Sequence, residues 1–360
     1  MLEPVSRTTT LTPQQLEAEV QSGNFQSQLK FYRQDFTGCN LSGGYFERVE
    51  FIECQFDKNN FIDGIFEQCR FDASHFVECE FKNVHFLACF FLDVHFHKNR
   101  WASLNFINHC QFDGALVLDC TMESCLFHEV SLVGLRCEGC QLKGLTFSQG
   151  VLNKVQFLKC QLSLCVFLSC SMEQMAWRES KIFQTLFNDS ALTGQDFSGL
   201  NLEKCQFVGT NVSGCRFAKA RLTQASFCGA QANKADFSGI EGTMAIFMEA
   251  ELEEARFGGA TCYGGNFQGA KMRKANFEKA NLEMAMMASC DLTEAKMNGA
   301  KLDYADLSHA DLSLTHLLYS SMYRTNLHEA RVDSTIWTLD VYAVALGTDP
   351  ERKKAENWGK

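Results

Sequence analysis

Large apolar residues recur at every fifth position through most of the chain. The pattern runs from Phe31 to Phe106, resumes after one extra residue at Phe112, and ends at Trp337, which gives 62 five-residue units. Of the 32 phenylalanines, 29 occupy this central position. A period of five matches neither an α-helix nor a β-strand, whose side-chain periods are about 3.6 and 2.0 residues. The pattern is typical of a chain that turns a corner every five residues.

A small residue lies two positions before each large central one. It is often cysteine early in the chain, as at Cys54 and Cys89, and mostly alanine later, as at Ala270 and Ala305. We therefore expect the small and the large residue to point inward. Fifteen of the 18 cysteines hold the small position. Since a buried cysteine behaves as a small apolar residue, we interpret them as core residues, and so many unpaired thiols favour a reducing compartment.

Several units follow the order small residue, Asn or Asp, then Leu or Phe, as in Ala275–Phe277 and Ala305–Leu307. Through these units the chain resembles the pentapeptide-repeat family over roughly residues 31–337. The resemblance implies an all-β fold, a right-handed quadrilateral β-helix with four units, or 20 residues, in each of about 15 coils. Such solenoids bury a continuous core only by stacking, so their two ends need caps.

The ends of the chain differ from the repeat. We predict three segments: an N-terminal capping helix in 1–28, a β-helix in 29–337 with a one-residue register shift near 107–109, and a C-terminal cap and polar tail in 338–360. In the first segment, Thr12 is the expected N-cap and Pro13 the first helical residue. Gln15 completes a capping box, and Gly23 follows the helix.

One coil carries unusually small central residues. Ala232 and Gly242 lie at opposite centres of this coil, between Phe237 and Phe247. The loss of two large side chains at the same level predicts either a local void in the core or a flexible point in the stack.

No catalytic motif occurs in the sequence, since GxGxxG, P-loop, HExxH and GxSxG patterns are all missing. His75 and His95 are 20 residues apart and should stack on one face beside His97. Such imidazoles form either a weak metal site or a solvated ladder, and the ladder is the favoured interpretation. A filled solenoid also lacks a substrate pocket. We predict a non-enzymatic protein without catalytic, cofactor or metal sites.

The chain has no run of 18 apolar residues, which excludes a membrane-spanning helix by sequence. Its first ten residues lack the apolar core of a signal peptide. We therefore expect a cytoplasmic protein. Delivery out of the cell without a classical signal peptide stays open.

The net charge of −10 raises the question of DNA mimicry, because some pentapeptide-repeat proteins bind type II topoisomerases by imitating DNA. Residues 1–150 hold 11 basic and 19 acidic side chains, whereas residues 151–300 hold 15 of each. B-DNA carries one negative charge per about 1.7 Å of its axis, a far higher charge density than that of this protein. Because its charge is too low for a close imitation of DNA, a gyrase-binding mimic that causes inhibition or quinolone protection is kept as the alternative function. The sequence has no stripe of basic residues, so we expect no direct binding to nucleic acid.

One face of the predicted solenoid is almost free of charge. Around the centres from Phe127 to Leu327, taken every 20 residues, only Asp306 is charged among 22 flanking residues, against nine or ten on each other face. If the insertion near Asn108 is a simple bulge, the face continues toward Tyr45. Charge depletion around exposed apolar residues is typical of interfaces. The residues predicted to contact a partner are Leu126, Val166, Leu168, Leu186, Val208, Ile246, Met248 and Met286.

These observations predict a protein-binding scaffold or adaptor that presents flat β-helix faces. The occupant of the apolar face is either a protein partner or a second copy of the chain. Because large pentapeptide-repeat proteins include accessory proteins and effectors of bacterial secretion systems, the resemblance also implies that role.

Overall fold

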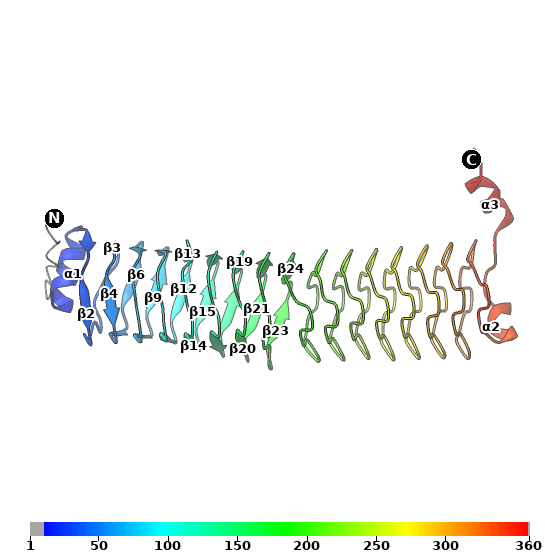
Figure 1. Ribbon diagram of the computed structural model, residues 1–360, viewed down its shortest axis with the longest axis horizontal. Coiled ribbons are helices and arrows are strands. Elements are labelled where there is room, and N and C mark those ends of the chain that lie inside the picture. Colours follow the sequence, from blue (N-terminus) through cyan, green and yellow to red (C-terminus); the bar gives the residue numbers. More distant parts are fainter. Residues whose placement is uncertain (1–10, 359–360) are drawn as a thin grey trace, which may run out of the picture. The chain divides into compact units, whose positions relative to one another are not determined.

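The structure is a computed structural model that describes residues 11–358. It contains two compact units, Met1–Lys181 and Ile182–Lys360. Each unit is a stack of parallel coils whose neighbours are 20 residues apart in sequence (Figure 1). In both units the large central residues and the small residues two positions earlier are buried from Phe31 to Leu327 with few exceptions. The predicted β-helix, with its alternation of inward positions, is therefore confirmed.

Every coil has four faces, named here after one central residue of the first unit. The Phe127 face consists of β1 (Gln26–Ser27), β3 (Tyr45–Glu47), β7 (Ile65–Glu67), β10 (His85–Leu87), β13 (Asn105–Ile107), β16 (Leu126–His128), β19 (Thr146–Ser148) and β22 (Val166–Leu168). The Phe96 face consists of β5 (Gln55–Asp57), β8 (His75–Val77), β11 (His95–His97), β14 (Leu116–Leu118), β17 (Arg136–Glu138) and β20 (Gln156–Leu158).

The two remaining faces of the first unit complete each coil. The Trp101 face consists of β6 (Asn60–Ile62), β9 (Glu80–Lys82), β12 (Arg100–Ala102), β15 (Thr121–Glu123), β18 (Gln141–Lys143) and β21 (Gln161–Ser163). The Phe91 face begins with β2 (Lys30–Tyr32) and β4 (Glu50–Ile52) and continues through single bridges. These strands pair in parallel, so each side chain lies above its equivalent in the preceding coil.

The second unit contains little regular strand. Strands β23 (Lys181–Phe183) and β24 (Leu186–Asn188) are followed by coils that single parallel bridges join, such as Ile246 to Asn266. The chain ends in two short helices, α2 (Leu339–Ala343) and α3 (Pro350–Glu356). Helix α3 has no buried residue. None of the helices in residues 11–358 is long and apolar enough to cross a membrane.

The extra residue of the repeat is absorbed at one corner of the first unit. Strand β10 pairs with β13 at an offset of 20 residues, whereas Asn105 pairs with Leu126 at an offset of 21. Asn108 and His109 both have positive φ, 58° and 64°. Because this corner takes up the insertion, Tyr45, Ile65 and their successors share one face with Leu126.

Helix α1 (Pro13–Gln21) starts as the sequence predicts. The Thr12 Oγ1 accepts from the Gln15 N–H at 3.2 Å, and the Gln15 Oε1 accepts from the Thr12 N–H at 2.8 Å, which confirms the capping box. Leu16 and Val20 are buried. The Glu17 carboxylate accepts from the Asn40 N–H at 2.8 Å, so the helix is attached to the first coils.

The phenylalanines of the first unit stack along the direction of the coils. Phe46 and Phe66 have ring centroids 4.6 Å apart and nearly parallel planes, and Phe66 continues to Phe86 at 5.1 Å. Rings on adjacent faces meet edge to face, as Phe56 and Phe51 do at 5.5 Å. Each such pair adds about 0.5–1.5 kcal/mol to the burial of the rings. The interior is therefore filled by side chains.

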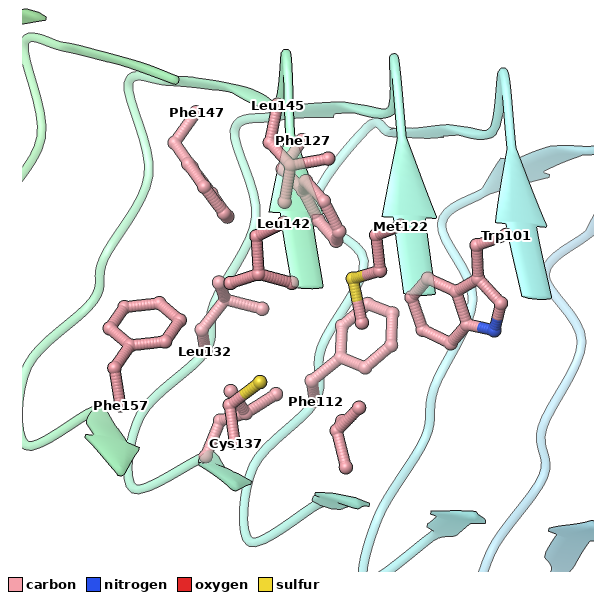
Figure 2. A pocket seen from close by; sticks show the side chains of 12 residues that line it. Trp101, Phe112, Met122, Phe127, Leu132, Cys137, Leu142, Leu145, Phe147 and Phe157 are labelled. Carbon is pink, nitrogen blue, oxygen red and sulfur yellow. The ribbon is translucent and has the colours of Figure 1, made fainter. Parts of the chain in front are cut away.

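A small cavity interrupts this packing where phenylalanine gives way to smaller centres. It has a volume of about 20 Å³ and lies next to Val117, Cys137 and Leu142, between Trp101 and Phe157 (Figure 2). The lining is apolar, so the cavity is expected to be dry.

The void predicted beside Gly242 is wrong. A Cβ atom on Gly242 would lie 3.1 Å from the Ile240 Cδ1, so no open space surrounds this glycine on its inward side. Ile240 holds a small position with a large side chain and fills that level of the core.

Each corner places the second residue after the centre in the left-handed region, with φ near +50° to +75°. Among residues 11–358, no Val, Ile, Thr or Pro occupies such a position, because β-branched residues and proline are poorly compatible with positive φ. Backbone N–H groups also bond the coils together, as when the Phe36 N–H donates to the Gln55 carbonyl at 2.8 Å. Proline can supply neither the positive φ of a corner nor the backbone N–H donor between coils. Pro13 and Pro350 lie outside the coils, each at the start of a helix.

The corners of the two units close differently. In the second unit, the N–H of the small residue donates directly to the preceding centre, as from Ala270 to the Phe267 carbonyl at 3.0 Å. At many corners of the first unit, a side chain from the next coil bridges these groups. The Cys79 N–H donates to the Asn99 Oδ1 at 2.7 Å, and the Asn99 Nδ2 donates to the Phe76 carbonyl at 2.9 Å. The small inward residues of the first unit are therefore hydrogen-bonding parts of the corners.

Cysteine makes the same bridge with its thiol. The Cys89 N–H donates to the Cys110 Sγ at 3.3 Å, and the Cys110 thiol donates to the Phe86 carbonyl at 3.3 Å. A thiol must be protonated to donate, and burial favours this state in Cys54 and Cys79, whose thiols donate to the Phe31 and Phe56 carbonyls. Burial raises the pKa of Cys54 to about 11 and that of Cys79 to about 12. None of the 18 cysteines, which all lie within residues 11–358, forms a disulfide, and only Cys228 is not buried.

Candidate protein-binding face

In the first unit, the predicted contact residues lie together on the Phe127 face. Leu126 pairs with Thr146 and Thr146 with Val166, so one column of side chains follows the coils. Leu168 lies in the neighbouring column and is 39% exposed, whereas Leu126 and Val166 are half-buried. Leu164, which the flanking positions did not include, is 51% exposed at the adjacent corner. The apolar strip is thus partly open to solvent.

The second unit has its own strip, on the face centred on Phe247. Parallel bridges connect Leu186 through every twentieth residue to Ile246 and Met286. Val208 and Met286 are 40% and 47% exposed. Leu186, Ile246 and Met248 are half-buried. All five predicted residues of this unit therefore occupy one face.

The structure adds a ridge of residues that sequence reasoning missed. Met244, Met284 and Tyr304 lie at the corner next to the Phe247 face, and their exposed fractions are 53%, 51% and 51%. Tyr323 lies 5.6 Å from Tyr304, measured between ring centroids. The sequence signal for this ridge is an apolar or aromatic residue at the second position after a central residue. The prediction considered only the residues directly beside each centre, so it left this position out.

The histidine ladder forms on the Phe96 face of the first unit. His75 and His95 pair in adjacent strands, with ring centroids 4.8 Å apart and an interplanar angle of 88°. Burial, together with the neighbouring His95, lowers the pKa of His75. The His97 Nε2 lies 3.7 Å from the Asp119 Oδ2 instead of joining the pair. Two edge-to-face imidazoles do not amount to a metal site.

Three side chains in the second unit have metal-ligand types and close atoms. The Nε2 atoms of His309 and His328 each lie 3.2 Å from the Glu356 Oε2. However, the Asp349 N–H donates to the His328 Nδ1 at 3.1 Å. The neutral His328 ring must therefore carry its proton on Nε2, which leaves no lone pair there for a metal. The cluster is a hydrogen-bonded attachment of α3 to the coils.

Three buried sulfurs in the first unit form a similar group. Cys137, Cys140 and Cys160 place their Sγ atoms within 4.8 Å of one another. Hydrogen bonds from Cys140 and Cys160, together with burial, raise the pKa of Cys137 well above its usual value. The Cys160 thiol donates to the Cys137 carbonyl at 3.3 Å. The thiols of Cys140 and Cys160 belong to the corner bridges, whereas Cys137 fills a central position of the core.

Comparison with family models supports what the coils indicate. The model described as "Pentapeptide repeats (8 copies)" matches residues 35–72, 245–285 and 290–329. The model described as "Pentapeptide repeat region" matches residues 180–257. The chain belongs to the pentapeptide-repeat family. No curated protein matches the sequence.

Several solved structures of pentapeptide-repeat proteins are similar to the chain. HetL, involved in heterocyst differentiation regulation in the cyanobacterium Nostoc sp. strain PCC 7120, has 18% identity and a TM-score of 0.33. The match covers 60% of this chain and 86% of HetL. Trypsin-treated QnrB1, a plasmid-mediated fluoroquinolone resistance protein, has 18% identity, coverage of 57% and 97%, and a TM-score of 0.26.

A third similar structure comes from a plant. A pentapeptide-repeat protein of the Arabidopsis thaliana thylakoid lumen has 31% identity and a TM-score of 0.17. That match covers 26% of this chain and 68% of the plant protein. These likenesses concern the repeat fold and do not identify a partner for this pentapeptide-repeat protein.

Proposed function

We propose that this pentapeptide-repeat protein is a non-enzymatic, cytoplasmic scaffold or adaptor that binds a protein partner through its charge-poor apolar strips. The observation that supports it is the restriction of charge depletion to one face. A chain that merely tolerated scattered exposed apolar residues would not clear charge from a single face. Desolvating charged groups is costly, so a surface without them is suited to burial in a complex.

The interior offers little to a small substrate. The apolar cavity enclosed in the first unit, of about 20 Å³, is far below the roughly 300–1,000 Å³ of typical ligand pockets. A larger hollow of about 400 Å³ lies at the surface beside His109 and Glu129. Family membership supports a finer proposal, a role as an accessory protein or effector of a bacterial secretion system, by analogy alone.

The test is a pull-down of partners from bacterial lysate, read by mass spectrometry. The variant Leu168→Glu/Leu186→Glu places one carboxylate on the strip of each unit. The matched control, Leu158→Glu/Tyr319→Glu, places the same charges on exposed or half-buried apolar positions away from the strips. A partner retained by the wild type and the control, but lost from the strip variant, is the expected result.

Two outcomes would contradict the proposal. If all three proteins retained the partner equally, the strips would not be part of the surface that binds it. If the partner retained equally were gyrase or another topoisomerase, the DNA-mimic alternative would replace the adaptor. Circular dichroism of the variants shows that a loss of binding does not reflect unfolding.

A further inference from the structure

The strip of the second unit lies beside the exposed ridge. Val208, Ile246, Met248 and Met286 lie on the Phe247 face. The corner beside this face adds the exposed side chains of Met244, Met284 and Tyr304. Methionine adapts its shape to a partner, and tyrosine and methionine are enriched in interface cores. Beside the centres of this face, Asp306 is the one charged residue.

We propose that this surface pairs with the same surface on a second copy of the chain, around a two-fold axis that lies in the interface at the Phe247 coil. This inference rests on the proposed function, because it names the occupant of the same strip in the second unit. A two-fold contact is isologous, so every contact between two residues occurs twice.

Electrostatics favour this face for self-pairing. The chain carries a net charge of −10, so two copies repel each other in general. Other surfaces of the second unit carry ion-pair ladders, such as Arg216–Asp196 at 2.7 Å and Lys271–Glu251 at 3.2 Å. Covering these groups would desolvate charges on both copies. On the Phe247 face, contact with an identical surface avoids most of this desolvation.

The order of residues along the strip is suited to a two-fold axis at Phe247. Val208 and Met286 lie two coils before and two coils after this residue, on opposite sides of the line of centres. Coils are about 4.8 Å apart and residues rise about 3.3 Å along a strand. With these dimensions, a two-fold axis inclined by roughly 20° to the strands exchanges the positions of Val208 and Met286. The two stacks then cross at roughly 40°, near the angle of about 30° at which β-sheets pack face to face.

In this arrangement, apolar side chains meet at three levels. Val208 faces Met286 of the second copy, and Ile246 and Met248 surround the axis. Between these levels, Cys228 of one copy lies against the amides of Asn266 and Gln268 of the other, which can donate hydrogen bonds. Beside the centres, the proposed contact therefore buries no charged side chain, and the nearest carboxylate to the axis is that of Glu249, at the corner after Met248.

The size of the surface predicts a weak dimer. Roughly eight coils about 4.8 Å apart extend for roughly 35 Å, and a strand-wide face with its corner is about 13 Å across. Each copy would bury at most roughly 500 Å², less than the approximately 800 Å² of a standard interface. We therefore expect a dissociation constant of about 10 μM or weaker.

Sedimentation velocity of the full chain, from about 5 to 300 μM, tests the pairing. We expect the wild type to shift from monomer to dimer over this range. Met286→Glu and Val208→Lys should each weaken dimerisation at least tenfold, because each places an unpaired charge opposite an apolar residue. Tyr319→Glu, which changes an 83% exposed residue outside the strip, should leave dimerisation unchanged.

The double variant Val208→Lys/Met286→Glu tests the position of the axis. In the proposed register, each lysine faces the glutamate of the other copy, so dimerisation should recover and become sensitive to salt. A wild type that stays monomeric at all concentrations, or single variants that still dimerise, would overturn the pairing. Single variants that dissociate without recovery in the double variant would overturn the axis at Phe247. Urea unfolding of every variant verifies that its fold is intact.

Failure of this inference is distinguishable from failure of the proposed function. A monomeric wild type that still retains a different protein through the strips contradicts only the self-pairing. A dimeric wild type whose pull-down partner ignores both strips contradicts only the adaptor role.

Discussion

The two units form the hydrogen bonds of their corners with different groups. In the first unit, cysteine, serine or asparagine from the next coil bridges the turn, as Ser74 does between the Cys54 N–H and the Phe51 carbonyl, both at 3.0 Å. In most of the second unit, alanine occupies this position and the turn closes on itself. The bridged corners coincide with regular strands, which end at Asn188. The comparison teaches that a bridging side chain accompanies the corners between regular strands, whereas in the second unit Thr315 donates to the Leu292 carbonyl across a corner that still closes on itself.

The largest expected effect is that of alkaline pH on the first unit, which holds 13 of the 18 cysteines. Burial raises the pKa of Cys54, Cys125 and Cys165 to about 11, above the usual value of 9.0. A raised folded pKa gives stability that is present below pH 9 and lost as pH rises through about 11. Each pKa unit corresponds to about 1.4 kcal/mol for each thiol.

Tryptophan fluorescence measures this effect, because Trp101 and Trp177 are buried in the first unit. In a Trp337→Phe/Trp358→Phe background, emission reports the first unit alone. We expect urea unfolding of this unit to shift to lower denaturant between pH 8 and 11. A midpoint that is independent of pH over this range would show that the thiols do not need to remain protonated.

Loss of an asparagine bridge should have the next largest effect. Asn99→Ala removes the partner of both the Cys79 N–H and the Phe76 carbonyl, leaving two buried groups unsatisfied. We expect the free energy of unfolding of the first unit to fall by about 3 kcal/mol in urea denaturation. Asn60→Ala, at an exposed site on the Trp101 face, is the control and should change it by less than about 0.5 kcal/mol. Equal effects of the two variants would refute the bridging role.

A matched pair of cysteine variants compares the units directly. Cys110→Ala removes a thiol bridge, whereas the Cys290 N–H already donates to the Met287 carbonyl at 3.4 Å. We expect Cys110→Ala to cost about 1–2 kcal/mol more than Cys290→Ala in urea unfolding, and Cys110→Ser to recover part of the difference because its hydroxyl can donate. Identical costs for the two alanine variants would mean that the thiols act only by filling space.

The smallest expected effect concerns reactivity and leaves the stability unchanged. Cys228 is the single cysteine of the chain that is not buried. Iodoacetamide applied to dilute native protein should therefore label one thiol, and urea should release the other 17. Mass spectrometry of the intact protein counts the labels. Rapid labelling of a second site would show that a corner opens without global unfolding.

The sequence predicts the coils because their period of five is set by side chains that must point inward. Phe46, Phe127 and Phe247 lie on equivalent positions for this reason, and the capping box at Thr12 follows from local hydrogen bonds. The bridged corners were not predicted, because the bond from Asn99 to Phe76 spans 23 residues and depends on the stacking of coils. The void at Gly242 was wrong because a position expected to be small carries a large side chain that supplies the missing volume.

The candidate face was predictable in part. The residues beside each centre, such as Leu168 and Met286, are placed on a face by the period alone. The ridge at Met244 and Tyr304 was missed because corner side chains were assigned to no face, although the fold brings them beside one. Partner identity depends on a second surface, which neither the period nor the core specifies.

The corner at Asn108 and His109 has a consequence for how such a protein can change in length. One extra residue is absorbed there while the strands on either side keep their faces and their partners. A corner is therefore a place where an inserted peptide, an epitope or a protease site can be added without shifting the stack. Growth of the stack itself needs whole coils, because a partial duplication would exchange one face for another. Gene rearrangements in this family should therefore favour multiples of 20 codons, with odd lengths confined to corners.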